Sequence, residues 1–271
     1  MMPVTVTKGS GPIVLGLPHT GTFVPADVHA NLNENGRKLA DTDWHIDRLY
    51  DGLIPNVTTV TANFHRYVID ANRDPEGASL YPGQNTTTLV PLTDFDGLGI
   101  WETLPTEADI ATRRRQFHTP YHNALTAELE RVRALHGVAI LYDCHSIRSD
   151  IPHLFEGILP DFNIGTNKGT TCAPIIQGLT ERVTTSQGLA HGAQYTSVTN
   201  GRFKGGWTTR HYGKPSQNIH AIQMELALST YLETEEPPWT YDAEKAFPIR
   251  TRLRQILQSL EGISISLGEQ S

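Results

Sequence analysis

The stretch Val138–Arg148, which reads VAILYDCHSIR, decides the interpretation of the fold. Its first five residues are apolar or aromatic, and such a run indicates a strand buried on both faces of a sheet. Asp143 and His145 follow where this strand is expected to end, and ligands of open α/β sheets bind at the carboxyl ends of strands. We therefore expect chemistry at His145, with Asp143 pointing to the same side of the chain. The plainer alternative is a strand end followed by a capping serine.

The composition excludes several classes of protein. The chain has 271 residues, 38% of them hydrophobic, which predicts a packed core, and we expect one domain over residues 1–271. The net charge is −7 and no block of like charges occurs, so a nucleic-acid partner is not expected. A small anionic substrate would have to be bound by locally placed arginines.

The two cysteines, Cys144 and Cys172, make no disulfide framework and favour a reducing compartment. The N-terminal residues lack the apolar region of a signal peptide, and no apolar run has the ~18 residues of a membrane span. These observations predict a cytoplasmic protein without a membrane partner. Association into a homo-oligomer is left open.

Other polar residues follow predicted strands or lie on a predicted helix. His19 comes directly after the apolar run Ile13–Leu17. The stretch 41–53 predicts a helix on which Asp43 and Asp47, four residues apart, share a face. Their mutual repulsion would be relieved by a cation between them. The alternative is ordinary enrichment of acids at a helix N-terminus.

Two further segments favour binding and catalysis. Tyr67–Ile69 is expected to bring Asn72 and Arg73 to a strand end, where they could hold a carboxylate, although a structural Arg–Asp pair is the alternative. Glu225 is embedded in the predicted strand 221–228, and burial would raise its pKa into the range of a general base. A structural salt bridge is the alternative for Glu225. The glycine-rich segment 200–213 adds positive side chains in an acidic protein.

The common metal and nucleophile motifs are absent: the sequence contains no HExxH, no zinc-finger cysteine pairs and no GxSxG. His118 and His122 are four apart and could share a metal, but Pro120 lies between them and no carboxylate is suitably placed nearby. Two imidazoles from His19 and His145 with one carboxylate and an open position describe a catalytic zinc site instead.

The sequence resembles the N-formylglutamate amidohydrolase (N-formylglutamate deformylase) family. The resemblance spans most of the chain and is specific because several motifs occur together. These motifs are GLPHTGTFVP (16–25), DTDWHIDRLYD (41–51), FHRYVIDANRDP (64–75), LYPGQNTTTLVP (80–91), YDCHSIRS (142–149), NGRFKGGWTTRHYG (200–213) and IQMEL (222–226). The family implies hydrolysis of N-formyl-L-glutamate to formate and L-glutamate in histidine degradation. It also implies a three-layer α/β/α sandwich around a mixed, mostly parallel sheet, like that of zinc carboxypeptidases and aspartoacylases.

The resemblance implies a metal centre in which His19 and His145 bind Zn²⁺. Where those relatives place a glutamate three residues after the first histidine, this chain has Thr22. The carboxylate must then come from the helix that follows, and we expect Asp47, with Asp43 as the alternative. The identity of the divalent metal is not fixed by the sequence.

The resemblance also implies the remaining roles. Glu225 would be the base that deprotonates the attacking water, and Arg66 would polarise the formyl carbonyl. Asn72 with Arg73 would hold the α-carboxylate of the substrate, and the other carboxylate would be held by Arg210 or Arg202. The alternative function is an amidohydrolase that uses the same metal on another N-acyl amino acid or a peptidoglycan-type amide.

Overall fold

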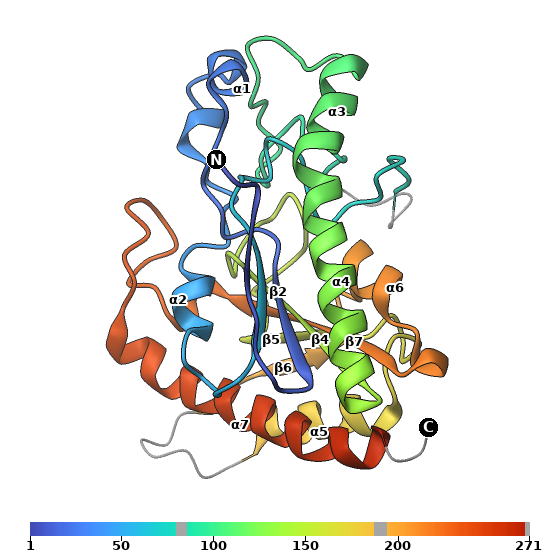
Figure 1. Ribbon diagram of the computed structural model, residues 1–271. Coiled ribbons are helices and arrows are strands. Elements are labelled where there is room, and N and C mark those ends of the chain that lie inside the picture. Colours follow the sequence, from blue (N-terminus) through green and yellow to red (C-terminus); the bar gives the residue numbers. More distant parts are fainter. Residues whose placement is uncertain (80–85, 187–193, 269–271) are drawn as a thin grey trace.

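The computed structural model describes residues 1–79, 86–186 and 194–268 (Figure 1). The first six residues of the LYPGQNTTTLVP motif lie outside this part of the chain. One sheet of seven strands forms the centre of the molecule. The strands are β1 (Val4–Thr7), β2 (Ile13–Leu17), β3 (Thr58–Ala62), β4 (Ala139–Ile147), β5 (Phe162–Gly165), β6 (Ser197–Thr199) and β7 (Ile219–Ala227).

The strand order is β1-β3-β2-β4-β7-β5-β6. The pairs β3–β2, β2–β4, β4–β7 and β5–β6 are parallel, whereas β1–β3 and β7–β5 are antiparallel. The prediction of an α/β protein with a mixed, mostly parallel sheet is thus confirmed.

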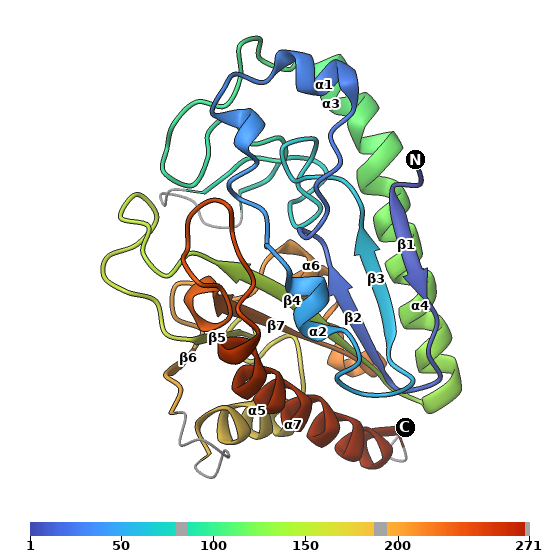
Figure 2. The ribbon, with the colours of Figure 1, turned by 90° about the vertical axis from the view of Figure 1, so that its left-hand side faces the viewer.

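Helices pack on both faces of the sheet (Figures 1 and 2). The α-helices are α1 (Ala26–Asn31), α2 (Ile46–Tyr50), α3 (Glu107–Arg113), α4 (Thr119–His136), α5 (Pro174–Thr185), α6 (Trp207–Tyr212) and α7 (Ala243–Gly268). The π-helical turn η2 (Arg114–His118) joins α3 to α4, and α1 and α3 lie beyond the ends of the strands (Figures 1 and 2). Helices α4 and α6 contribute to the core on one face, and α2, α5 and α7 to the core on the other. This is the expected three-layer α/β/α arrangement. Within the described residues, no helix is long and apolar enough to cross a membrane.

Strand β4 is buried on both faces, as its apolar sequence predicts. Leu141 packs in the core that includes α4, whereas its neighbour Tyr142 packs in the core formed with α2 and α7. Successive side chains of a strand point to opposite faces, so alternate residues of β4 stabilise both layers. Asp143 and His145 continue the row of Leu141 on the α4 side.

The site is created by a difference in strand length. β4 and β7 have nine residues each, whereas β2 has five, and the register pairs Gly16 with Asp143. The end of β4 therefore extends past β2, and the chain after β2 carries His19 alongside it. The expectation that β4 ends before its polar residues is wrong, because the strand continues through His145 to Ile147.

Two other local predictions are corrected. Helix α2 begins only at Ile46, so Asp43 lies in the turn before the helix and does not share a helix face with Asp47. The segment 65–73 forms turns rather than a strand, although most of it is buried. Its backbone groups bond to distant parts of the chain, which a local hydrophobic pattern does not reveal.

Candidate active site

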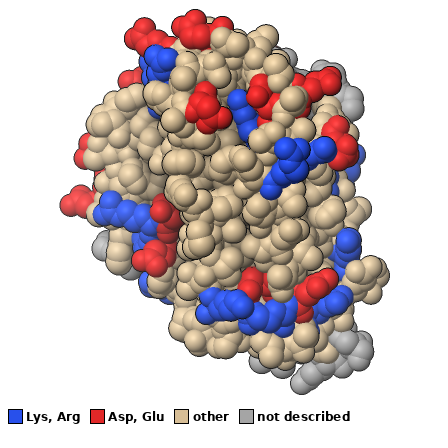
Figure 3. All heavy atoms as spheres, turned by 45° about the horizontal axis from the view of Figure 1, so that its top comes forward, with Lys and Arg blue, Asp and Glu red and all other residues tan. Residues whose placement is uncertain are grey.

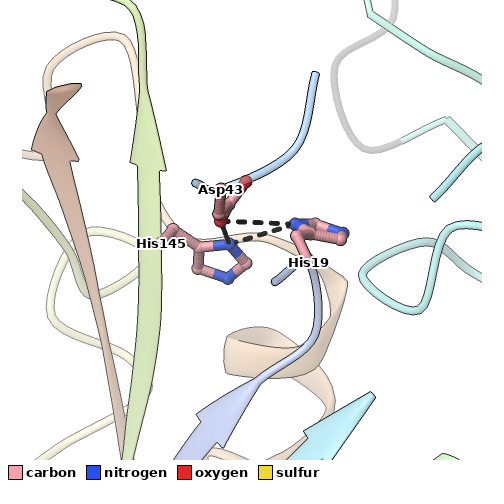
Figure 4. A group of neighbouring side chains, drawn as sticks. All are labelled: His19, Asp43 and His145. Carbon is pink, nitrogen blue, oxygen red and sulfur yellow. Dashed lines mark hydrogen bonds and ion pairs between the residues drawn. The ribbon is translucent and has the colours of Figure 1, made fainter. Parts of the chain in front are cut away.

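Three buried side chains from distant parts of the chain converge beside the end of β4 (Figure 4). The Nδ1 atoms of His19 and His145 lie 3.2 Å apart. Oδ2 of Asp43 lies 3.3 Å from Nδ1 of His145 and 3.8 Å from Nδ1 of His19. A backbone hydrogen bond brings Asp43 close to His19, because the amide of Asp43 donates to the carbonyl oxygen of His19 at 3.1 Å.

Each histidine is oriented by a second carboxylate on the opposite side of its ring. Nε2 of His19 lies 2.6 Å from Oδ1 of Asp70, and Nε2 of His145 lies 3.1 Å from Oδ1 of Asp143. A carboxylate accepts hydrogen bonds, so each Nε2 carries a proton. Nδ1 of His19 then presents a lone pair, and so does Nδ1 of His145 when that ring is neutral. Asp143 was expected as the partner of His145 from the two-residue spacing, whereas Asp70 was not expected as the partner of His19.

These contacts test whether a metal fits. Two imidazole lone pairs and the carboxylate of Asp43 face one another in a buried space, and electron-pair donors so placed repel unless a cation or a proton lies between them. Two histidines and one carboxylate, each histidine held by an outer carboxylate, are the ligand set of catalytic zinc sites. The group His19, Asp43 and His145 could therefore bind a metal ion.

The protonation properties of the group follow from burial and charge. Burial, followed by the nearby Arg66 guanidinium, lowers the pKa of His19 to about 4. Burial alone would lower the pKa of His145, but the carboxylate of Asp143 raises it well above its usual value. Burial alone would raise the pKa of Asp43, but Arg66 holds it below its usual value. At neutral pH, Asp43 therefore stays negatively charged and His19 stays neutral, whereas a positive charge is favoured on His145.

Asp47 does not reach this group, which corrects the preferred carboxylate. It is an exposed residue in the first turn of α2 and lines a different hollow, beside Thr59 and Thr61 of β3. Asp43, the alternative, takes the position next to the histidines because α2 begins three residues after it. The sequence alone was compatible with either acid as the ligand. The structure distinguishes them, because Asp43 precedes the first residue of α2 and Asp47 lies within the helix.

Glu225 lies on β7 directly opposite His145 in the strand register. Burial raises the pKa of Glu225 to about 7, while the positive charge favoured on His145 opposes that shift. Nε2 of Gln223 donates to Oε2 of Glu225 at 3.0 Å, and Oε1 of Gln223 accepts from the amide of Gly206 at 2.6 Å. One carboxylate oxygen of Glu225 is therefore fixed toward Gln223, a residue that sequence reasoning missed. The sequence signal that could have identified Gln223 is its position two residues before Glu225, which places both side chains on the same face of the strand.

Arg66 lies next to the cluster and is almost completely buried. Its Nη2 donates to Oδ1 of Asp43 at 3.0 Å, and its guanidinium lies 5.0 Å from the ring centre of Phe95. Burial alone would lower the pKa of Arg66, but Asp43 and other carboxylates raise it. A permanently positive group thus faces the pocket beside the candidate metal ligands.

A hollow opens over these residues. Asn72 and Arg73 line it, and so does Arg202 from the glycine-rich segment. Arg210 is not part of this lining, and its Nε donates to the carbonyl oxygen of Gly205. Apolar side chains complete the wall: Phe95, Ile147, Leu154 and Phe203.

The outer surface seen in Figure 3 carries a mixture of positive and negative side chains, whereas most charged residues of the pocket are arginines. Figure 3 shows one face of the molecule, on which basic and acidic side chains lie close to one another around a wide neutral area. The pocket, by contrast, is lined by three arginines, Arg66, Arg73 and Arg202, and by one carboxylate, Glu225. The pocket is therefore the place where an anionic substrate would be recognised.

Comparisons with known proteins reveal the family to which the chain belongs. The family model described as N-formylglutamate amidohydrolase matches residues 11–232. The chain belongs to the N-formylglutamate amidohydrolase family. A relative from Pseudomonas aeruginosa named N-formylglutamate deformylase is 44% identical over 256 residues, covering 93% of this chain and 94% of the relative. The relative of that name from Pseudomonas putida is 45% identical over 257 residues, covering 93% of each chain.

Solved structures of the same architecture are also similar. The N-formylglutamate amidohydrolase of Ralstonia eutropha has a TM-score of 0.76 and 26% identity, covering 100% of this chain and 98% of that one. A protein from Agrobacterium tumefaciens has a TM-score of 0.67 at 18% identity, covering 98% and 96% of the two chains, and this likeness concerns the fold alone. Members of the N-formylglutamate amidohydrolase family thus share this arrangement of sheet and helices.

Proposed function

We propose that the protein hydrolyses N-formyl-L-glutamate to formate and L-glutamate. The observation that carries this proposal is the match to two N-formylglutamate deformylases over 93% of the chain. The site supports it independently. A buried acid, two oriented imidazoles and a general-base candidate surround a pocket lined by arginines.

We propose His19, Asp43 and His145 as the ligands of one divalent cation. Nitrogen and carboxylate ligands in a set of three, with a further position free, suit Zn²⁺. When bound, this cation would act as a Lewis acid and lower the pKa of the attacking water. Asp70 and Asp143 would direct both Nδ1 atoms toward the cation, because each accepts a hydrogen bond from Nε2 on the far side of the ring.

Glu225 is the proposed base. Its carboxylate would take a proton from the water that attacks the formyl carbon and pass it to the amide nitrogen as the carbon–nitrogen bond breaks. A pKa near neutrality suits both steps, because the group must accept and then release the proton. Gln223 holds one carboxylate oxygen, which directs the other toward the pocket. Arg66 would stabilise negative charge as it develops on the formyl oxygen.

The substrate must be oriented by its glutamate part, because a formyl group offers almost no surface to bind. We propose that Asn72 and Arg73 hold one carboxylate and that Arg202 holds the other. Arg202 is preferred over Arg210 because only the former lines the pocket. Two charged anchors fix the direction of the molecule between them, which aligns the amide with the base.

The test is formate release from N-formyl-L-glutamate by the purified protein, with and without a chelator. We expect turnover that the chelator abolishes and that added Zn²⁺ restores. A panel of other N-acyl amino acids measures acyl and side-chain preference in the same assay. Faster hydrolysis of an N-acetyl substrate, or turnover that survives complete removal of metal, would contradict the proposal.

A further inference from the structure

The buried segment 65–73 carries the residues proposed to hold a substrate carboxylate, and it is neither helix nor strand. Buried carbonyl groups of an irregular segment need donors from other parts of the chain. Two of these donors are imidazoles. Nε2 of His122 lies 2.8 Å from the carbonyl oxygen of Ala71, and Nε2 of His118 lies 3.0 Å from that of Arg73. Two carbonyls of the segment, two residues apart, are therefore held by two histidines.

The helix brings both histidines to the segment together. His118 is the last residue of the π-helical turn η2, and His122 lies in the first turn of α4. Residues four apart share a helix face, and the two ring centres are 4.3 Å apart. Pro120 lacks an N–H group, and the wide π-helical turn directly before it lets the helix continue. The four-residue spacing, which is also compatible with a shared metal, here lets both histidines donate to carbonyl groups of the segment 65–73.

The same histidines pack against the element that holds the side chain of Asn72. The ring of Trp207, the first residue of α6, lies 5.8 Å from that of His118 and 4.8 Å from that of His122, between ring centres. The next residue, Thr208, donates its backbone N–H to Oδ1 of Asn72 at 2.9 Å. The backbone and the side chain of Asn72 are thus fixed through one packed group.

We infer that His118 and His122 are positioning residues for the carboxylate-binding pair Asn72 and Arg73. They donate to the carbonyl groups on both sides of Asn72 and so set the direction in which Asn72 and Arg73 face the pocket. This inference rests on the proposed function of that pair. It assigns a role in substrate binding to two helical histidines that do not line the pocket themselves.

Burial favours a neutral ring at His122. The ring donates through Nε2 to the carbonyl oxygen of Ala71. Its Nδ1 lies 3.0 Å from the hydroxyl of Tyr212, which also donates to the carbonyl oxygen of His122 at 3.2 Å. Burial lowers the pKa of His122 to about 3 and also lowers the pKa of His118 below its usual value. Both rings therefore stay neutral donors at physiological pH.

The experiment compares leucine and glutamine at each position by steady-state kinetics with N-formyl-L-glutamate. His118→Leu and His122→Leu remove the donor, and we expect KM to rise about tenfold while kcat changes by less than about threefold. His118→Gln and His122→Gln place an amide N–H near the position of Nε2, so we expect them to recover most of the lost affinity. Metal content should equal that of the wild type in all four variants.

A matched control comes from the same aromatic group. His211 stacks on Trp207 with ring centres 4.3 Å apart, but among the described residues it makes no hydrogen bond to the segment 65–73. We expect His211→Leu to leave KM unchanged. If the leucine variants do not fold, His118→Asn gives the same contrast with His118→Gln, because its amide is one methylene too short to reach the carbonyl.

The outcomes separate this inference from the proposed function. A wild-type protein that releases no formate overturns the proposed function, and the inference falls with it. An active wild type with unchanged KM in the His118 and His122 leucine variants overturns the inference alone. So does an equal rise of KM in the leucine and glutamine variants, because packing rather than the donated hydrogen bond would then be the cause.

Discussion

His145 and Glu225 are register partners on the neighbouring parallel strands β4 and β7. Partners in a sheet point to the same face, so the carboxylate of Glu225 is placed beside a candidate metal ligand by backbone pairing alone. Two residues earlier on each strand, Asp143 and Gln223 repeat the relationship and hold these two side chains. The rigid pairing of β4 with β7 thus sets the distance between the proposed base and the proposed metal ligand.

This relationship predicts that Glu225→Gln separates catalysis from metal binding. The glutamine keeps the shape and can still accept from Gln223, but it cannot take a proton from water. We expect kcat to fall by about 10²- to 10⁴-fold, the usual contribution of a general base, with KM and metal content close to those of the wild type. Formate release and elemental analysis measure these quantities. A variant with near-normal kcat would remove Glu225 from the role of base.

The two acids near α2 give a second prediction with a built-in control. Asp43→Asn should lose bound metal and activity, because the carboxylate between the two imidazoles becomes neutral. Asp47→Asn, an identical chemical change four residues away at an exposed position, should retain both.

Metal content by elemental analysis decides the outcome, and thermal unfolding supports it. A ligand that binds the folded state raises Tm, so a chelator should lower the Tm of the wild type and of Asp47→Asn but not that of Asp43→Asn. Full metal content in Asp43→Asn, or its loss in Asp47→Asn, would reverse the assignment of the two residues.

The contrast between Asp43 and Asp47 shows where sequence reasoning succeeds and where it stops. The apolar runs predicted the presence of β2, β4 and β7, because a strand buried on both faces is apolar along most of its length. The start of α2 could not be predicted as well, since it depends on contacts with distant residues. The amide of Asp43 donates to the carbonyl oxygen of His19, and this long-range bond holds the turn before the helix.

The site shows the same limit. The structure places His19, His145, Glu225, Arg66 and Arg73 around one pocket. His19, His145 and Arg73 could be proposed from expected strand ends, Glu225 from its place within a predicted strand, and Arg66 from the family resemblance. Their roles stay predictions until tested. The segment 65–73 and the partners of its carbonyls could not be predicted, because no periodic pattern marks an irregular segment whose hydrogen bonds come from a helix far away in the sequence.

A third prediction concerns the charge of the substrate. If Asn72 and Arg73 hold the α-carboxylate and Arg202 the side-chain carboxylate, Arg202→Ala should reduce kcat/KM for N-formyl-L-glutamate much more than for N-formyl-L-glutamine, which lacks the side-chain charge. The preference for glutamate should shrink by about tenfold or more, since hydrogen bonds to charged groups contribute ~1.5–3 kcal/mol. Arg210→Ala should keep the preference, because Arg210 does not line the pocket. An unchanged preference in Arg202→Ala would mean that another group binds this carboxylate.

The last prediction concerns the pH dependence of stability. Burial, and secondarily the neighbouring His118, lower the pKa of His122 from 6.5 to about 3 in the folded chain, whereas the usual value returns on unfolding. Between these two pH values the unfolded chain binds the extra proton. The contribution of His122 to the free energy of unfolding is therefore fully present above about pH 6.5 and is lost progressively as the pH falls toward 3.

A difference of one proton corresponds to a slope of ~1.4 kcal/mol per pH unit. Other buried groups, including His65, contribute in the same direction, so the comparison with a variant isolates the part due to His122. His122→Gln cannot take up this proton, and we expect its stability to fall less steeply than that of the wild type between pH 6.5 and pH 5. Urea unfolding at several pH values measures both slopes. Parallel slopes would show that the His122 ring is already protonated, or freely protonated, in the folded protein.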